Sequence, residues 1–154
     1  MLLYHGSNVI VREPMIVKTA HTKDFSWGFY TTETLKQAEN WAQRRSQRYG
    51  GSPCISVFEY SPSSDLHMVE FKTTSDEWLD FIAACRSGKT HSFDVVAGPM
   101  ADDAIWNIVE DYLSGLISRE EFLAVAQFRH PTHQMSFHTI AALSKLQFKE
   151  GYEL

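Results

Sequence analysis

Two short stretches of the chain decide the fold: Tyr4-His5-Gly6-Ser7 near the N-terminus, and Trp27-Gly28-Phe29-Tyr30-Thr31-Thr32 further on. The first places a histidine and a glycine at the end of a short apolar run, which indicates a strand. The second places a tyrosine two residues after a glycine, and its threonines are good caps for a following helix. Neither stretch is diagnostic alone. Their order, together with a third segment that begins at Gln134, carries the interpretation.

Around these stretches, expected strands and helices alternate irregularly. Strands are expected over residues 2–5, 9–11, 28–31, 54–60, 66–71, 93–97, 134–138 and 146–149, and helices over 33–49, 75–86, 101–113, 118–128 and 140–144. In the helix over 33–49, four apolar residues recur at helical spacing and predict a buried stripe: Leu35, Ala38, Trp41 and Ala42. Ser118 and Glu121 form a capping box. No repeat or linker divides the chain, so we expect a single α+β domain over 1–154.

The composition is that of an ordinary globular protein. The chain has 154 residues, of which 44% are apolar and 21% charged, and its net charge of -5 argues against coating nucleic acid by bulk electrostatics. A local basic patch stays open. The two cysteines, Cys54 and Cys85, lack metal-ligand spacing and are expected to be buried, reduced thiols. No apolar run is long enough to cross a bilayer, and the N-terminal segment turns polar too early for a signal peptide, so we expect a cytoplasmic protein without membrane association.

Five ordered motifs connect the chain with a known family. They are Tyr4-His5-Gly6-Ser7, Asp24-Phe25-Ser26-Trp27-Gly28-Phe29-Tyr30, Gln37-Ala38, Trp41-Ala42, and Asp94-Val95-Val96-Ala97-Gly98-Pro99-Met100-Ala101-Asp102-Asp103. On these residues the chain resembles the ADP-ribosyltransferase superfamily, in its diphtheria-toxin-like and poly(ADP-ribose)-polymerase-like branch. That branch is marked by a His-Tyr-Glu triad spread over three strands. The chain is similar in particular to an uncharacterised bacterial group within the branch, and the resemblance extends to about His138.

The resemblance implies both a fold and a substrate. The implied fold is an ADP-ribosyltransferase-like split β-sheet core with surrounding helices and a cleft for NAD between its halves. His5 would hydrogen-bond the adenosine-side ribose of NAD, and Tyr30 would stack on the nicotinamide. Gly6 would present its backbone to the nicotinamide amide, where a side chain would obstruct the approach. Ser7 would add a ribose or amide contact, and Gly28 completes the implied NAD-binding set.

The third triad position falls on Gln134, where the family has glutamate. Glutamine can still donate and accept hydrogen bonds. Because it carries no charge, it stabilises a developing cation less well and cannot act as a general base. The implied catalytic set is therefore His5, Tyr30 and Gln134, and we expect no chain-extending poly-ADP-ribosylation. Single transfer, NAD hydrolysis, and a target that brings its own base stay open.

The expected function is an NAD-dependent mono-ADP-ribosyltransferase. By analogy with the family, it would be a bacterial toxin-like effector of a toxin–antitoxin or phage-defence system. Its partners would be a macromolecular acceptor of ADP-ribose, either protein or nucleic acid, and an antitoxin protein. Two alternatives stay open: a catalytically weak NAD-binding module without transferase activity, favoured by Gln134, and an interaction protein whose acidic surface binds a partner.

Two further clusters have simpler interpretations. Arg44, Arg45 and Arg48 lie near the C-terminus of an expected helix, where the helix dipole favours cations, so we expect a solvated face. A contact with a phosphate of NAD or of a nucleic-acid target is the alternative. The histidines His130, His133 and His138 match no common zinc spacing, and no cysteine joins them, so we expect no metal site.

Overall fold

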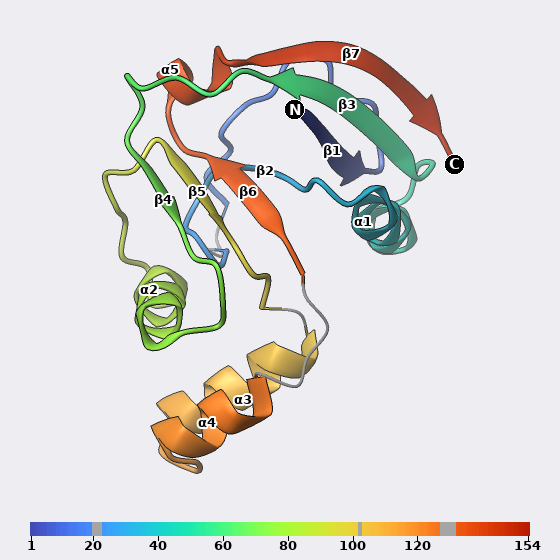
Figure 1. The fold of residues 1–154 in the computed structure, drawn as a ribbon. Helices are drawn as coiled ribbons and strands as arrows, with labels where there is room; N and C mark the ends of the chain where they lie inside the picture. The colour runs from blue at the N-terminus through green and yellow to red at the C-terminus, as the bar shows by residue number, and fades with distance from the viewer. Residues whose placement is uncertain (20–22, 102, 127–131) are drawn as a thin grey trace.

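The computed structural model describes residues 1–19, 23–101, 103–126 and 132–154. Within these residues the chain forms two small sheets and five helices, which confirms the expected α+β class (Figure 1). The elements are, in chain order, β1 (Leu2–Ser7), β2 (Phe29–Thr31), α1 (Leu35–Tyr49), β3 (Cys54–Tyr60), β4 (Met68–Glu70), α2 (Asp76–Arg86), β5 (Val95–Gly98), α3 (Asp103–Leu113), α4 (Arg119–Ala126), β6 (Gln134–Phe137), α5 (Ile140–Leu143) and β7 (Leu146–Glu153).

The two sheets meet where β1 and β2 lie side by side. The first sheet has the strand order β1-β3-β7 and is antiparallel, whereas the second has the order β2-β6-β5-β4, in which only β4 and β5 are parallel. Tyr4 and Thr32 join the sheets through two backbone hydrogen bonds of 2.8 and 2.9 Å. Since Tyr4 precedes His5 and Thr32 follows Tyr30 by two residues, this bridge brings the two decisive stretches together.

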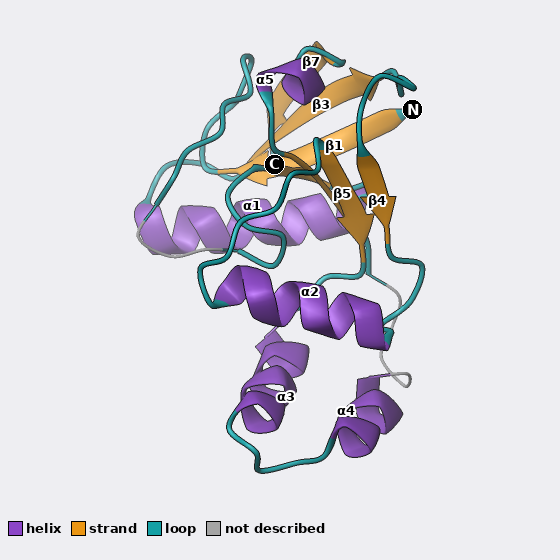
Figure 2. Ribbon diagram, turned by 90° about the vertical axis from the view of Figure 1, so that its left-hand side faces the viewer, coloured by secondary structure: helices purple, strands orange, loops and turns teal. Residues whose placement is uncertain are grey.

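The second sheet is covered on both faces, and β5 lies inside it. Val96 joins an apolar core with Trp78 of α2, whereas its neighbours Val95 and Ala97 join the core shared with the first sheet. This alternation is the period of two expected for a strand that is buried on both sides. Figure 2 shows α2, α3 and α4 on the side of the second sheet that faces away from the first.

Helix α1 covers the outer face of the first sheet. Ala38 and Ala42 are fully buried against Ile55 and Val57 of β3. The small alanine side chains allow the helix to approach β1 very closely. The approach is so close that a Cβ atom added at Gly6 would lie 1.9 Å from the Ala38 carbonyl oxygen. Glycine at position 6 is therefore a condition of this helix-on-sheet contact.

The structure differs from the sequence-based expectation at a few boundaries. Residues 9–11 form no strand, because the Val11 amide donates to the Ser56 hydroxyl (2.8 Å) instead of to a strand ladder. Helix α1 begins after Thr34, since the Thr32 backbone is already engaged in the bridge to Tyr4. The capping box between Ser118 and Glu121 is confirmed, with hydrogen bonds of 3.1 and 3.3 Å.

The structure bears on two further expectations, the state of the cysteines and the presence of a membrane-spanning helix. Cys54 and Cys85 are both buried free cysteines, as expected, and burial raises the pKa of the Cys85 thiol to about 11. A thiol with this pKa stays protonated and unreactive at neutral pH. Among the residues that the structure describes, no helix combines the length and the apolar composition needed to span a bilayer.

Candidate functional site

A cavity of about 380 Å³ opens at the junction of the two sheets. Its volume lies in the range of small-molecule sites. The lining residues come from β1, β2, α1, α2, β6 and two loops: His5, Gly6, Ser7, Lys23, Asp24, Tyr30, Trp41, Arg44, Arg45, Arg86, Met100, Ala101 and Gln134. A larger hollow of about 620 Å³ lies between residues 12–16 and α5, but it contains none of the residues singled out from the sequence. The first cavity is therefore the candidate site.

His5 enters the cavity as a neutral imidazole. Its Nδ1 lies 2.7 Å from the Tyr30 carbonyl oxygen, which can only accept, so Nδ1 carries the proton and Nε2 is left as an acceptor. Burial lowers the pKa of His5 to about 4, and the positive charges of Lys23 and Arg45 act in the same direction. The ring also stacks on Phe29, with 4.4 Å between centroids. His5 is therefore a fixed, uncharged acceptor at neutral pH.

Tyr30 offers its ring rather than its hydroxyl. The hydroxyl donates to the Ser26 carbonyl (2.6 Å) and accepts from the Phe25 amide (2.9 Å), so both of its hydrogen-bonding roles are filled. Burial raises the pKa of Tyr30 well above its ordinary value, which excludes a phenolate at neutral pH. The Lys23 ammonium lies 4.8 Å from the ring centroid. A ligand that stacks on Tyr30 must therefore share the ring with Lys23 or displace it.

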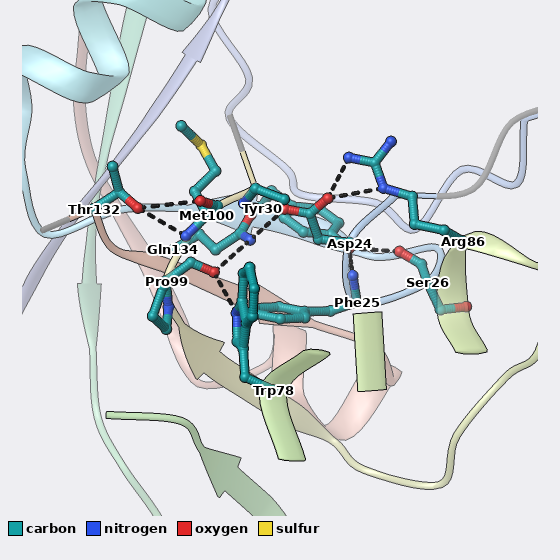
Figure 3. A network of polar contacts seen from close by, with 11 residues as sticks. Asp24, Phe25, Ser26, Tyr30, Trp78, Arg86, Pro99, Met100, Thr132 and Gln134 are labelled. Carbon is teal, nitrogen blue, oxygen red and sulfur yellow. Dashed lines mark hydrogen bonds and ion pairs between the residues drawn. The ribbon is translucent and has the colours of Figure 1, made fainter. Parts of the chain in front are cut away.

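Gln134 is held by its amide nitrogen. Nε2 donates to Asp24 Oδ2 (2.9 Å) and to the Pro99 carbonyl (3.3 Å), as Figure 3 shows. Both partners are acceptors, so the orientation of the amide group is fixed by chemistry. Within the described part of the chain, Oε1 accepts no hydrogen bond. The Gln134 side chain is 3% exposed and lines the cavity, so Oε1 is a ready acceptor for a ligand hydroxyl.

Asp24 is a cavity residue that the sequence analysis did not single out as a site residue. Its carboxylate is buried and fully engaged: Oδ1 accepts from Nε (2.9 Å) and Nη2 of Arg86, and Oδ2 accepts from the Ala101 amide (2.8 Å) and from Gln134. A carboxylate this deeply buried is tolerated only because it is paired and hydrogen-bonded. Asp24 stood in a quoted motif, but nothing in the sequence connected it with Gln134, 110 residues away.

The motif Gln37-Ala38 of α1 connects this helix with β6 and with β1. The Gln37 amide donates to the His133 carbonyl and accepts from the His133 backbone amide (3.2 Å). These two bonds tie α1 to the residue that precedes β6. Gln37 therefore fixes where Gln134 enters the cavity, while Ala38 provides the contact for Gly6.

The α1 wall makes the cavity basic. Arg44 and Arg45 are exposed, as expected for a solvated helix face, and they also line the cavity together with Lys23. Trp41, expected in the buried stripe of α1, is half-buried and also lines the cavity. Among the described residues, Lys23 and Arg45 form no ion pair with a carboxylate. In a chain of net charge -5, this concentration of cations complements a negatively charged ligand.

The remaining predicted residues divide into two groups. Ser7 and Gly6 line the cavity, and the Ser7 hydroxyl donates weakly to Asn8 Oδ1 (3.4 Å). The Cα hydrogen of Gly6 that a side chain would replace faces α1, so the packing of α1 requires this glycine, and ligand access is not the reason. Gly28 does not line the cavity, because it packs against the His138 imidazole, 2.8 Å from the position of a Cβ.

The histidines expected not to bind metal have other partners. His138 bonds to the Trp27 carbonyl (2.8 Å) and to the Ser136 hydroxyl (2.7 Å), whereas His133 lies 3.8 Å from Glu33. His130, like Asp102 of the last motif, lies outside the described residues. Within the ranges that the structure describes, no three His, Cys, Asp or Glu side chains gather in a metal-binding arrangement.

Comparison with known proteins gives one match. The model of a family described as "Protein of unknown function (DUF3990)" matches residues 1–148. No curated protein and no solved structure matches the chain. Because the family match covers nearly the whole chain, the protein belongs to the DUF3990 family.

Proposed function

We propose that this protein is an NAD-dependent mono-ADP-ribosyltransferase built on an ADP-ribosyltransferase-like split sheet. One observation carries the proposal: His5 of β1, Tyr30 of β2 and Gln134 of β6 line the same cavity, although they lie far apart in the sequence. These are the three positions that the resemblance to the His-Tyr-Glu branch assigned to NAD. The basic α1 wall supports the proposal further, because the two phosphates of NAD are negatively charged.

In the proposed reaction the cavity holds NAD in a bent conformation. His5 Nε2 accepts from a hydroxyl of the adenosine-side ribose, and the Tyr30 ring stacks on the nicotinamide. Gln134 Oε1 accepts from a hydroxyl of the nicotinamide ribose. The bond between ribose C1′ and the nicotinamide nitrogen breaks with its electron pair on nicotinamide, and an acceptor lone pair forms the new bond to C1′. The proton of the acceptor passes to water or to a base on the acceptor. Positioning supplies much of the rate.

The neutral glutamine limits the chemistry. Among the described residues, the carboxylate that hydrogen-bonds Gln134 is Asp24, whose charge is balanced by Arg86. No charged group at position 134 is therefore left to activate a second ADP-ribose as nucleophile. The proposal is a single transfer to a macromolecular acceptor, or hydrolysis of NAD, without chain extension. A bacterial toxin–antitoxin or phage-defence setting, with an antitoxin partner, is part of the proposal by analogy alone.

The second candidate is an NAD-binding or partner-binding module without transferase activity. Two observations favour it: the uncharged Gln134, and the position of Lys23 over the Tyr30 ring, where the nicotinamide would stack. This candidate shares the NAD site with the first but breaks no bond in NAD.

Mass spectrometry of nicotinamide released from NAD separates the two candidates. The protein is incubated with NAD, with and without whole-cell extract, and labelled NAD reports whether protein or nucleic acid becomes modified. Release of nicotinamide supports the transferase. No release, combined with stabilisation by NAD, supports the module. At a concentration of a hundred times its Kd, NAD should raise the free energy of unfolding by about 2.7 kcal/mol. Absence of both effects rejects the transferase and the NAD-binding module, and leaves the partner-binding module.

A further inference from the structure

The C-terminal half of α1 carries positive charge from the cavity onto the protein surface. From Asn40 to Tyr49 the chain has three arginines and no acidic residue, although its net charge is -5. The helix dipole accounts for Arg48, which lies in the last turn. It does not account for Arg44 and Arg45, which lie one turn earlier and line the cavity. The charge therefore starts at the candidate site and continues outward.

An exposed aromatic ring lies beside these arginines at the C-terminal end of α1. Tyr49 is 58% exposed, and the guanidinium carbons of Arg45 and Arg48 lie 4.8 and 5.3 Å from its ring centroid. Neither of these arginines forms an ion pair within the described part of the chain. At the start of the same helix, by contrast, Lys36 is paired with Glu39 at 3.4 Å. Near the end of the helix, Arg45, Arg48 and the Tyr49 ring therefore lie together without a carboxylate partner among the described residues.

The cations at the cavity mouth repel one another. Burial and the charge of Arg45 lower the pKa of Lys23, and both of these cations help to lower the pKa of His5. An anion with several charges would relieve this repulsion along the whole row.

We propose that a surface made of Arg45, Arg48 and Tyr49, here named the arginine face, binds a single-stranded nucleic acid. The arginines contact successive phosphates, and an unpaired base stacks on Tyr49 or on the flanking guanidinium groups. A duplex would hide its bases from the ring, and a protein partner would need an apolar surface that this face lacks. Continuity with the cavity would bring the strand to the ribose C1′ of NAD, so the strand is the acceptor. The role as acceptor rests on the proposed function, whereas the binding does not.

Fluorescence anisotropy with labelled oligo(dT) of about 20 nucleotides, in the absence of NAD, tests the proposal. We expect binding at low salt whose affinity falls with salt, with a slope of log K against log salt of about -1.4 for two phosphate contacts. Arg48→Glu and Tyr49→Ala should each weaken binding at least about tenfold. Arg12→Glu is the matched control, because Arg12 lies over Phe148 at 5.1 Å in a similar pair outside the arginine face.

Three results would overturn the proposal. The first is no binding of oligo(dT) at low salt, and the second is an equal loss of affinity in Arg12→Glu and Arg48→Glu. The third is that duplex DNA binds as tightly as the single strand and that Tyr49→Ala does not change the affinity. Arg48 and Tyr49 are exposed, so circular dichroism should confirm that both variants fold. Binding without nicotinamide release would reject the proposed function and keep the arginine face. Nicotinamide release without oligonucleotide binding would support the proposed function and reject the role of the arginine face.

Discussion

At the scale of single residues, Asp24 and Gln134 decide the charge of the site. Gln134 donates to Asp24 over 2.9 Å, so a glutamate at position 134 would put two carboxylates within hydrogen-bonding distance. Repulsion in such a pair raises the pKa of one partner, which then keeps a proton. Gln134→Glu alone is therefore not equivalent to restoring the glutamate of the family.

Exchanging the two side chains tests this pairing. In Asp24→Asn/Gln134→Glu, the new amide at 24 can donate to the new carboxylate at 134, so this one hydrogen bond is kept and the negative charge moves to position 134, whereas the Ala101 amide loses its acceptor and the Pro99 carbonyl loses its donor. We expect the double variant to be at least about 1 kcal/mol more stable than the sum of the single variants, measured by urea unfolding. Nicotinamide release should rise about tenfold above the parent only in the double variant. Additive stabilities would show that the two side chains do not interact.

The Tyr30 ring and its hydroxyl can be tested separately. Tyr30→Phe leaves the buried Phe25 amide and Ser26 carbonyl without their partner, which should cost about 1–3 kcal/mol in unfolding free energy while NAD binding is kept. Tyr30→Leu also removes the stacking surface, so NAD binding should weaken several-fold more than in Tyr30→Phe. Calorimetric titration measures the affinities. Equal affinities in both variants would exclude stacking on Tyr30.

At the scale of elements, the contact of α1 with β1 depends on one missing side chain. Gly6→Ala would place a methyl group 1.9 Å from the Ala38 carbonyl oxygen, which forces the helix away from the strand. We expect a loss of about 1–3 kcal/mol in unfolding free energy, measured by urea unfolding. Ser7→Ala on the same strand is the control and should change stability by less than about 1 kcal/mol. Tolerance of Gly6→Ala would contradict the close packing.

Helices and strands set by local signals could be predicted from the sequence, whereas contacts between distant segments could not. Strand β3 and helix α2 follow the expected boundaries closely, because a continuous apolar run and the Ser75 cap are local signals. Residues 9–11 look like a strand locally, but the Ser56 hydroxyl takes the hydrogen bond of Val11. His5 and Tyr30 could be selected from their motifs. The partnership of Asp24 with Gln134 depends on long-range pairing of strands and loops, which no local pattern contains.

At the scale of the whole molecule, an acidic protein encloses a basic cavity. The net charge is -5, whereas Lys23, Arg44 and Arg45 lie together at the mouth of the site. The helix dipole favours arginines near the end of α1. Which of them face the cavity is determined by the rotation of the helix about its axis, which the packing of Ala38 and Ala42 on the sheet fixes. A ligand of negative charge is then attracted to one place on the surface.

The pH dependence of global stability follows from two partly buried histidines. Burial lowers the pKa of His5 and of His138 from 6.5 to about 4, so between these values the unfolded chain binds more protons than the folded chain. The contribution of each histidine to stability should be constant above about pH 7.5 and fall by about 2 kcal/mol between pH 7.5 and 5. Urea unfolding of the parent and of His138→Gln measures this, and the variant should lose about half of the pH dependence. An identical pH dependence in both would contradict a buried neutral His138.

The most direct test of the central claim is calorimetric titration of NAD into the parent protein, His5→Ala and His67→Ala. His5 lines the cavity, whereas the exposed His67 lies outside it and controls for loss of an imidazole. We predict that NAD binds the parent, that His5→Ala weakens binding about tenfold through loss of a ribose hydrogen bond, and that His67→Ala binds like the parent. No binding to the parent, or equal affinity for the parent and His5→Ala, would contradict the assignment of this cavity to NAD.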